Sequence, residues 1–400
     1  MREPKPITHV EVSEKNRTLR IICAVVLLVI GALALTSGIM ALLGKDTGWQ
    51  EVQISPEERS CSESFLLRYN FSDSGSEATA INKRLEQIYS DACVKAYQLF
   101  TPDEVFAGVQ NVYYVNHHVN EVVTVDPVLY GAFQKLEGTR WLYLGPAYAH
   151  YYNILFNADD SVVAELDPVL SREAADYVAR IAAFAADADA VKLELLGDNQ
   201  VKLHVGEDYL AFAQQEEIEN FIDFAYLTNA FIIDYLADAL IAQGLTRGYL
   251  VSTDGYTRNL DSENPFSFNI FDRVGRVVYP AGAMRYQGPI SIVYLKDYST
   301  APSDLNYRVS GDHIVHLFAD PADGIYRTSV PNLVSYSYDS GCADVVLKML
   351  PSFIGEHFTV PEGVFSVWCR EETIFYNDDS IRITDLLKEG DGSYRAVLQK

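Results

Sequence analysis

The sequence predicts an α+β protein behind a single N-terminal transmembrane helix. Helical patterns and strand patterns follow one another without the strict alternation that a parallel α/β sheet requires. Hydrophobic residues make up 48% and charged residues 22% of the 400 residues, which is typical of a globular protein. One long apolar run lies near the N-terminus. Together these observations exclude a disordered chain and a disulfide-dense miniprotein.

The apolar run at residues 21–44 contains no charged side chain and predicts a membrane anchor. At 1.5 Å per residue it makes roughly 36 Å of helix, enough to cross a hydrocarbon core of about 30 Å. Basic residues precede the run, so the positive-inside rule predicts a cytoplasmic tail at residues 1–20 and an extracytoplasmic bulk at the cell membrane. A cleaved signal peptide is the alternative, with a small-residue site at 32–34. The run continues well past that site, which favours the anchor.

The charge of the chain limits its partners. The formal net charge is −24, with 55 acidic residues against 31 Lys and Arg. A surface this negative repels phosphate backbones, so we expect no nucleic-acid partner. Four cysteines follow the apolar run without any C-x-x-C spacing. They allow three disulfide connectivities or free buried thiols, and the sequence does not choose among them. These four are Cys61, Cys93, Cys342 and Cys369.

The segment after the anchor divides into a polar stalk at residues 45–80 and a domain at residues 81–400. Five stretches with apolar residues at spacings of three and four predict helices. Thr228 is the predicted N-cap of the fourth helix, and Pro351 is predicted to end the fifth. The predicted helices cover residues 81–96, 126–137, 173–186, 228–244 and 343–350.

Alternating apolar and polar residues predict the strands. Residues 191–205 alternate around Gly197-Asp198-Asn199, which is typical of a β-hairpin. Short runs rich in β-branched and aromatic residues predict six further strands. These runs are 249–252, 267–271, 291–295, 313–318, 333–338 and 364–369.

Two clusters of potential metal ligands are better explained by local structure. Asp187-Ala188-Asp189 matches the D-x-D triplet with which membrane-anchored glycosyltransferases hold a divalent metal. It follows an Ala-rich helical stretch in an acidic chain, which favours a solvated helix terminus. His117 and His118 would lie on opposite faces of a strand, which disfavours a shared metal. The sequence contains no G-x-S-x-G, P-loop, H-E-x-x-H or G-x-G-x-x-G motif.

Three stretches, in order, carry a resemblance to a known family. Residues 223–234 read DFAYLTNAFIID and are followed by Gln243-Gly244 and by YLVSTDG at 249–255. Residues 316–324 read HLFADPADG, and residues 335–344 read SYSYDSGCAD. These stretches are similar to the D-L-G-G-x-A-K-G-x-x-x-D, G-G-D, H-H-I-x-D-P-x-T-G and A-D-x-x-x-T motifs of the FAD:protein FMN transferases (ApbE-type flavin transferases). The resemblance covers roughly residues 75–380.

The resemblance implies a flavin-transferase-like mixed domain and a set of site residues. In this family a divalent metal, Mg²⁺, polarises the pyrophosphate of FAD so that FMN is transferred to a Thr of a target protein. The resemblance then makes Asp344 the metal ligand and His316 a catalytic residue. It makes Asp223, Asp254 and Gly255 cofactor-binding residues.

The motifs also depart from the family pattern. Lys348 occupies the position of the metal-binding Thr, and Asn229-Ala230 replaces Lys-Gly. One His of the pair is Leu317, and G-G-D becomes Asp254-Gly255-Tyr256. Turns and caps are kept while site residues are changed, which favours a non-catalytic or repurposed relative that binds a flavin-like ligand or a protein. The alternatives are an active Mg²⁺-dependent transferase and a surface interaction module without a small-molecule site.

Overall fold

The chain divides into two units by its internal contacts. The first comprises residues 1–48 and 71–83, and the second comprises residues 49–70 and 84–400. All five residues that the family resemblance assigns to a site belong to the second unit. The computed structural model describes residues 47–72, 75–300, 307–310, 313–386 and 394–399.

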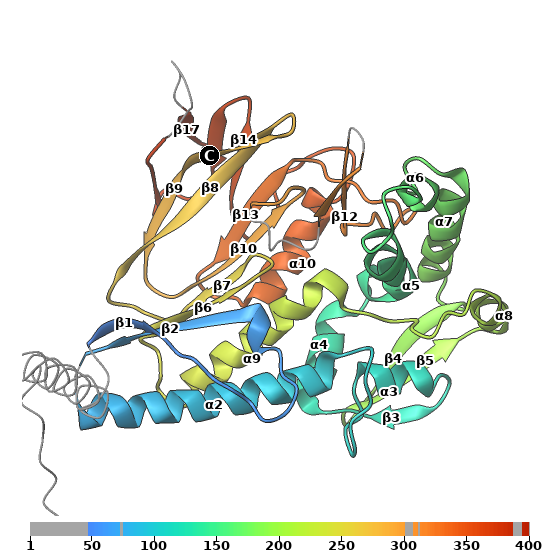
Figure 1. Cartoon of the computed structure of the whole chain (residues 1–400), viewed down its shortest axis with the longest axis horizontal. Helices are drawn as coiled ribbons and strands as arrows, with labels where there is room; N and C mark the ends of the chain where they lie inside the picture. Colours follow the sequence, from blue (N-terminus) through green and yellow to red (C-terminus); the bar gives the residue numbers. More distant parts are fainter. Residues whose placement is uncertain (1–46, 73–74, 301–306, 311–312, 387–393, 400) are drawn as a thin grey trace, which may run out of the picture. The chain divides into compact units, whose positions relative to one another are not determined.

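Helices and strands are mixed along the chain, as Figure 1 shows. The helices are α2 (Ser76–Phe100), α3 (Val112–His117), α4 (Pro127–Leu136), α5 (Gly145–Ala149), α6 (Val163–Leu166), α7 (Arg172–Ala186), α8 (Glu207–Gln215), α9 (Thr228–Ile241) and α10 (Cys342–Phe353). The strands are β1 (Gly48–Glu51), β2 (Phe65–Phe71), β3 (Val122–Thr124), β4 (Val191–Gly197), β5 (Gln200–Val205), β6 (Gly248–Ser252), β7 (Tyr256–Asn259), β8 (Pro265–Val274), β9 (Val277–Gln287), β10 (Ile290–Lys296), β11 (Tyr307–Ser310), β12 (His313–His316), β13 (Asn332–Ser337), β14 (Phe365–Arg370), β15 (Thr373–Tyr376), β16 (Arg382–Thr384) and β17 (Arg395–Leu398). The predicted α+β class is confirmed.

A nine-stranded sheet forms the framework of the second unit. Its strand order is β1-β2-β6-β7-β10-β13-β14-β15-β17. The middle strands pair antiparallel, with Val293 of β10 opposite Ser335 of β13, while β15 and β17 pair in parallel. Every residue of β10 is buried, because both faces of the sheet are covered at this strand.

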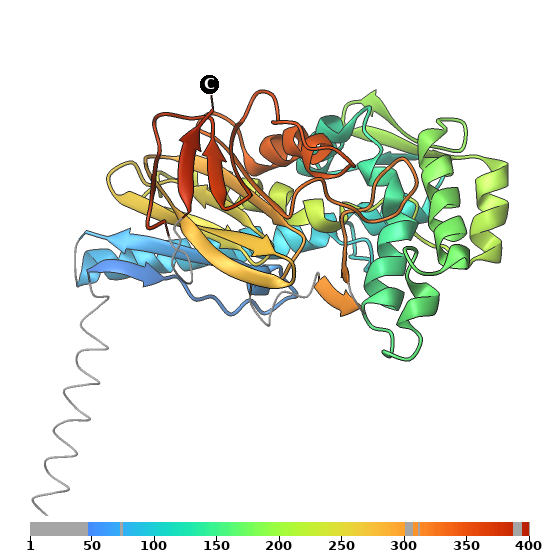
Figure 2. The same ribbon diagram turned by 90° about the horizontal axis from the view of Figure 1, so that it is seen from above.

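The two faces of the sheet are covered by different layers. The small sheet β16-β9-β8 covers one face, where Ile270, Met284, Ile292 and Tyr336 belong to one buried apolar cluster. Helices α9 and α10 pack on β6, β7, β10 and β13 and on each other. Figure 2 shows the strands and these two helices from above. The first turn of α10 and the middle of α9 thereby meet beside the sheet.

Most of the predicted helices are present, with differences at their ends. The helices predicted at 81–96, 126–137 and 173–186 are confirmed as parts of α2, α4 and α7, and the hairpin at 191–205 is confirmed as β4 and β5. Leu227 precedes α9, so Thr228 is its first residue rather than its N-cap. Pro351 lies inside α10, two residues before the helix ends. Pro351 has no N–H to donate to the preceding turn, which is consistent with the end of the helix shortly after it.

Two further local predictions differ from the structure, and a third is confirmed. Within the predicted stalk, residues 65–71 form β2 of the large sheet, because Phe65, Leu67 and Tyr69 alternate and bury one face. His117 and His118 end helix α3 instead of lying on a strand, and each ring stacks on the tyrosine four residues before it. Asp187 terminates α7 and accepts a hydrogen bond from the backbone N of Asp189, which confirms the helix-terminus interpretation of the triplet.

The membrane anchor predicted at residues 21–44 lies outside the described residues. Among the residues that are described, no helix combines the length and the apolar character needed to cross a bilayer.

Candidate functional site

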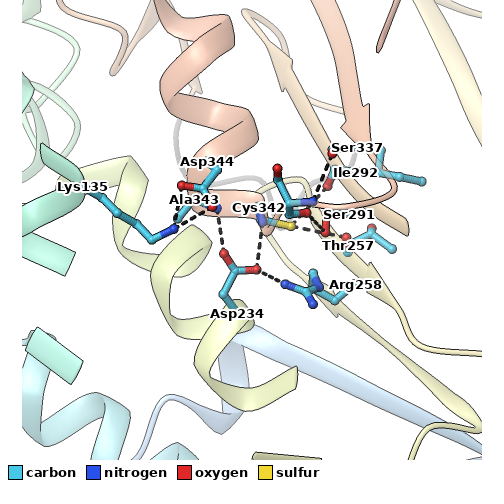
Figure 3. A network of polar contacts seen from close by, with 11 residues as sticks. Lys135, Asp234, Thr257, Arg258, Ser291, Ile292, Ser337, Cys342, Ala343 and Asp344 are labelled. Carbon is cyan, nitrogen blue, oxygen red and sulfur yellow. Dashed lines mark hydrogen bonds and ion pairs between the residues drawn. The ribbon is translucent and has the colours of Figure 1, made fainter. Parts of the chain in front are cut away.

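Asp234, in the middle of α9, joins three elements through one carboxylate. Its Oδ1 atom accepts a hydrogen bond from the backbone N of Cys342 at 2.8 Å, and its Oδ2 atom accepts one from the backbone N of Ala343 at 2.9 Å. Nη1 of Arg258, on β7, donates to Oδ1 at 2.5 Å. Figure 3 shows this network between α9, β7 and the first turn of α10. Asp234 therefore caps α10, which begins after Gly341 and has no side-chain cap of its own.

The pair of Asp234 and Arg258 is largely removed from solvent. The two side chains are 16% and 14% exposed. Burial acts to lower the pKa of Arg258, but the charge of Asp234, its hydrogen bond and the neighbouring Cys342 and Asp238 together outweigh burial, and the pKa is raised. Both oxygens of Asp234 are thus committed to the protein itself.

Lys135 and Asp344 form a second ion pair on the same side of α10. Nζ of Lys135, in the last turn of α4, lies 2.6 Å from both carboxylate oxygens of Asp344, in the first turn of α10 (Figure 3). The side chains are 41% and 37% exposed, so solvent screens the pair. One helical turn after Asp344, Nζ of Lys348 donates to the carbonyl O of Gly363 at 3.2 Å.

Both ion pairs border a pocket of about 690 Å³. Helices α4 and α9, strands β7 and β10, and the turn between β13 and α10 provide its walls. Apolar side chains such as Phe231 and Ile241 alternate with the charged ones, and Asp238 and Asp339 add two further carboxylates. The pocket therefore offers an apolar wall and several charges to a ligand, a combination typical of small-molecule sites.

The side chains at this pocket fit a magnesium ion poorly. Mg²⁺ takes an octahedral set of oxygen ligands. Both oxygens of Asp344 are engaged by Lys135, both oxygens of Asp234 are engaged by α10 and Arg258, and Lys348 supplies an ammonium where the family has a hydroxyl. Among the residues that the structure describes, no group of three or more His, Cys, Asp or Glu is arranged to hold a metal ion.

Asp223 and Asp254 are absent from the lining of this pocket, and both act electrostatically on Tyr152. Asp223 accepts a hydrogen bond from the backbone N of Ala225 at 2.7 Å, and Asp254 accepts one from Oγ of Ser252 at 2.6 Å. Burial raises the pKa of Asp223 to about 7 and that of Asp254 to about 6. Both carboxylates add to the effect of burial that raises the pKa of Tyr152, which lies in a π-helical turn. Perturbed carboxylates and π-helical turns are both concentrated at functional sites.

Gly255 follows Asp254, and the fold alone accounts for it. Its φ is +107°, and a Cβ atom there would collide with the carbonyl O of Tyr294. The carbonyl O of Gly255 accepts a hydrogen bond from the backbone N of Tyr294 at 2.8 Å. The close approach of the β6–β7 turn to β10 therefore requires a glycine.

His316 is buried at the end of β12. Its ring contacts Tyr326 and Phe318 at centroid distances of 5.0 and 5.4 Å. Nδ1 accepts a hydrogen bond from the backbone N of Phe318 at 3.3 Å. Burial, helped by the charge of Arg273, lowers the pKa of His316 to about 3, so the ring is neutral at physiological pH.

The five predicted site residues thus fall in separate places. Asp223 and Asp254 share only their electrostatic influence on Tyr152, and Gly255 follows Asp254 in the chain. Asp344 lines the pocket with Asp234. His316, Asp223 and Asp254 do not belong to that lining. Sequence analysis missed the cations Lys135 and Arg258, as well as Tyr152. No local motif marks them, because their partners lie far away in the sequence.

Comparison with known proteins supports the relationship at the level of the fold. The sequence matches no protein-family model and no curated protein. The solved structure of the flavin transferase ApbE from Vibrio cholerae is similar with a TM-score of 0.52 at 12% identity, over 84% of this chain and 97% of that one. The ApbE protein of Thermotoga maritima has a TM-score of 0.47 at 12% identity, over 74% and 83%. The apo flavinyl transferase ApbE of Pseudomonas stutzeri has a TM-score of 0.45 at 11% identity, over 82% and 93%.

Proposed function

We propose that this chain is a diverged relative of the ApbE flavin transferases that no longer transfers FMN and instead binds a flavin-like ligand without catalysis. The similarity of the fold and the order of the three motifs support the relationship. The pocket beside α10 supports ligand binding over a surface module without a small-molecule site, because an open volume of about 690 Å³ remains there.

One observation supports the loss of transfer above all others, the ion pair between Lys135 and Asp344. An ammonium 2.6 Å from both oxygens neutralises the carboxylate that the family resemblance assigns to the metal. The pair is more than one-third exposed, so its own strength is about 0.2–1 kcal/mol, and it opposes a metal through the positive charge held at the carboxylate rather than through its strength. Mg²⁺ is disfavoured by the ammonium of Lys135 on this carboxylate, and no group of three or more His, Cys, Asp or Glu among the described residues is arranged to hold a metal ion.

A transfer assay tests the proposal. The purified full-length chain is incubated with FAD, Mg²⁺ and a Thr-containing acceptor peptide, and covalent flavin on the peptide is measured by fluorescence after denaturing gel electrophoresis. We expect no labelled peptide from the wild type. Labelling that is lost in Asp344→Asn and kept in Lys192→Ala, an exposed lysine of β4, would overturn the proposal.

Active transfer remains the alternative, and it has a structural requirement. With Lys348 in place of the family's Thr, that side chain would have to contact phosphate. Its Nζ instead donates to the carbonyl O of Gly363. Lys348→Thr restores the family's residue at this position. If the chain is a non-catalytic relative, as we propose, this substitution alone should not produce transfer of FMN.

We also propose that residues 21–44 anchor the protein in the cell membrane, with residues 1–20 in the cytoplasm and the remainder outside. The uncharged length of this segment and the basic residues before it support the orientation. The test is extraction of membranes with alkaline carbonate, followed by protease treatment of intact cells. We expect the chain to stay with the membrane and its bulk to be cleaved from outside. Release by carbonate would contradict the anchor.

A further inference from the structure

Cys61 and Cys93 meet at the contact between a long connection and a helix. Cys61 lies on the segment between β1 and β2, directly before the short helix at Ser62–Ser64, and Cys93 lies on α2. The Sγ atom of Cys61 donates to the carbonyl O of Cys93 at 3.3 Å, and the backbone N of Cys61 approaches the same oxygen at 3.4 Å. Cys61 is also the first of the influences that raise the pKa of the Cys93 thiol. The two sulfur atoms are therefore neighbours in the folded chain.

The other two cysteines face different parts of the fold. The Sγ atom of Cys342 donates to the carbonyl O of Thr257, on β7, at 3.4 Å. The Sγ atom of Cys369 lies 3.8 Å from the carbonyl O of Phe271, on β8. Both side chains are buried, and the contacts given above for each sulfur atom are with backbone carbonyl groups rather than with a cysteine. Of the possible pairs, the structure favours Cys61 with Cys93.

We infer that Cys61 and Cys93 form a disulfide that fastens the connection before β2 to helix α2, while Cys342 and Cys369 stay reduced. In the cell, the proposed extracytoplasmic location would supply the oxidising conditions for this bond, so its formation there rests on that proposal. The pairing of the two cysteines in the purified protein does not depend on the location. Contact with Cys61, together with burial, raises the pKa of the Cys93 thiol, so the reduced Cys93 is protonated and unreactive while it stays buried.

The exposure of the two cysteines determines which of them reacts first in a thiol–disulfide exchange. Cys61 is 8% exposed and Cys93 is fully buried, so an external disulfide reaches Cys61 first. The Cys61 thiolate attacks oxidised glutathione and releases one glutathione thiol, which leaves a mixed disulfide on Cys61. The Cys93 thiolate then attacks the Cys61 sulfur and releases the second glutathione thiol. Two protein thiols are oxidised, and one glutathione disulfide is reduced to two thiols.

Peptide mapping tests this pairing without reference to flavin or membrane. The purified full-length chain is equilibrated with oxidised glutathione, alkylated in guanidinium chloride and digested without reduction. Mass spectrometry should then find the Cys61 peptide joined to the Cys93 peptide, with Cys342 and Cys369 alkylated. Alkylated or glutathionylated Cys61 and Cys93 without a cross-link, or a cross-link that involves Cys342 or Cys369, would overturn the inference.

A thermal comparison gives a second readout. Closing a loop of about 32 residues constrains the unfolded chain, so reductant should lower the Tm of the oxidised wild type by about 5 °C. Cys61→Ser should remove this response to reductant, and the control Cys369→Ser should retain it. A response that persists in Cys61→Ser would contradict the pairing even if both variants are less stable than the wild type.

Discussion

Replacing Asp234 by Ala should destabilise the fold strongly, because three donors lose their acceptor at once. The substitution leaves the backbone N–H groups of Cys342 and Ala343 without a cap and the guanidinium of Arg258 buried without its partner. Breaking a buried ion pair on one side costs about 3–5 kcal/mol, and loss of a helix cap costs about 1 kcal/mol. We expect a loss of about 4 kcal/mol in the free energy of unfolding. For a unit of this size that corresponds to about 5 °C in Tm.

A double-mutant cycle separates the ion pair from the cap. Urea unfolding of Asp234→Ala, Arg258→Met and the double variant is followed by tryptophan fluorescence. Arg258→Met removes the cation and leaves Asp234 free to cap α10, so the double variant should be more stable than the sum of the two losses predicts, by about 1–3 kcal/mol. Additive losses, or a loss below about 1 kcal/mol for Asp234→Ala alone, would show that Asp234 does not couple Arg258 to the start of α10.

Three further predictions follow from other contacts. Lys135→Ala should change the free energy of unfolding by less than about 1 kcal/mol in urea unfolding, since both partners are more than one-third exposed; a loss above about 2 kcal/mol would contradict this. Gly255→Ala should lower the Tm markedly, because position 255 has a φ of +107° and a Cβ atom there would collide with the carbonyl O of Tyr294. The control Gly275→Ala, at a φ of +63° with open space around it, should cost about 1 kcal/mol. Equal effects of the two substitutions would contradict the close approach of the β6–β7 turn to β10. The pKa of Asp223 is raised in the fold to about 7 from about 4 in the unfolded chain, so its contribution to stability is present below about pH 4 and is lost as the pH rises toward 7. Asp223→Asn should therefore lose less stability than the wild type between pH 5 and pH 8. Parallel pH profiles of the free energy of unfolding for the two proteins would contradict a buried carboxyl at this position.

The local patterns of the sequence predicted much of the fold. The helices α4 and α7 and the β4–β5 hairpin follow from spacing and turn residues alone, because their apolar faces repeat at 3.6 or 2 residues. Strand β9 escaped prediction because Pro280 and Gly282 interrupt it, and a register shift in its partner β8 accommodates them. Strand β2 was hidden by the polar residues on either side, although its own alternation is clear.

The candidate site was harder to predict than the fold. The spacing of Asp223 and Asp234 drew attention to the stretch that contains Asp234, but the hydrogen bond from the start of α10 to Asp234 joins residues 108 positions apart. The contact between Lys135 and Asp344 spans 209 positions. No local pattern indicates which distant side chain will lie opposite, so the sequence alone suggested an available metal carboxylate where the structure has an ion pair.

Calorimetric titration of the full-length chain with FAD, with and without Mg²⁺, shows whether a metal-dependent flavin site is present. We expect the affinity for FAD to be the same with and without the metal, because Asp344 and its neighbours do not form a magnesium site. Micromolar binding that requires Mg²⁺ and disappears in Asp344→Asn would contradict this expectation and support active FMN transfer instead.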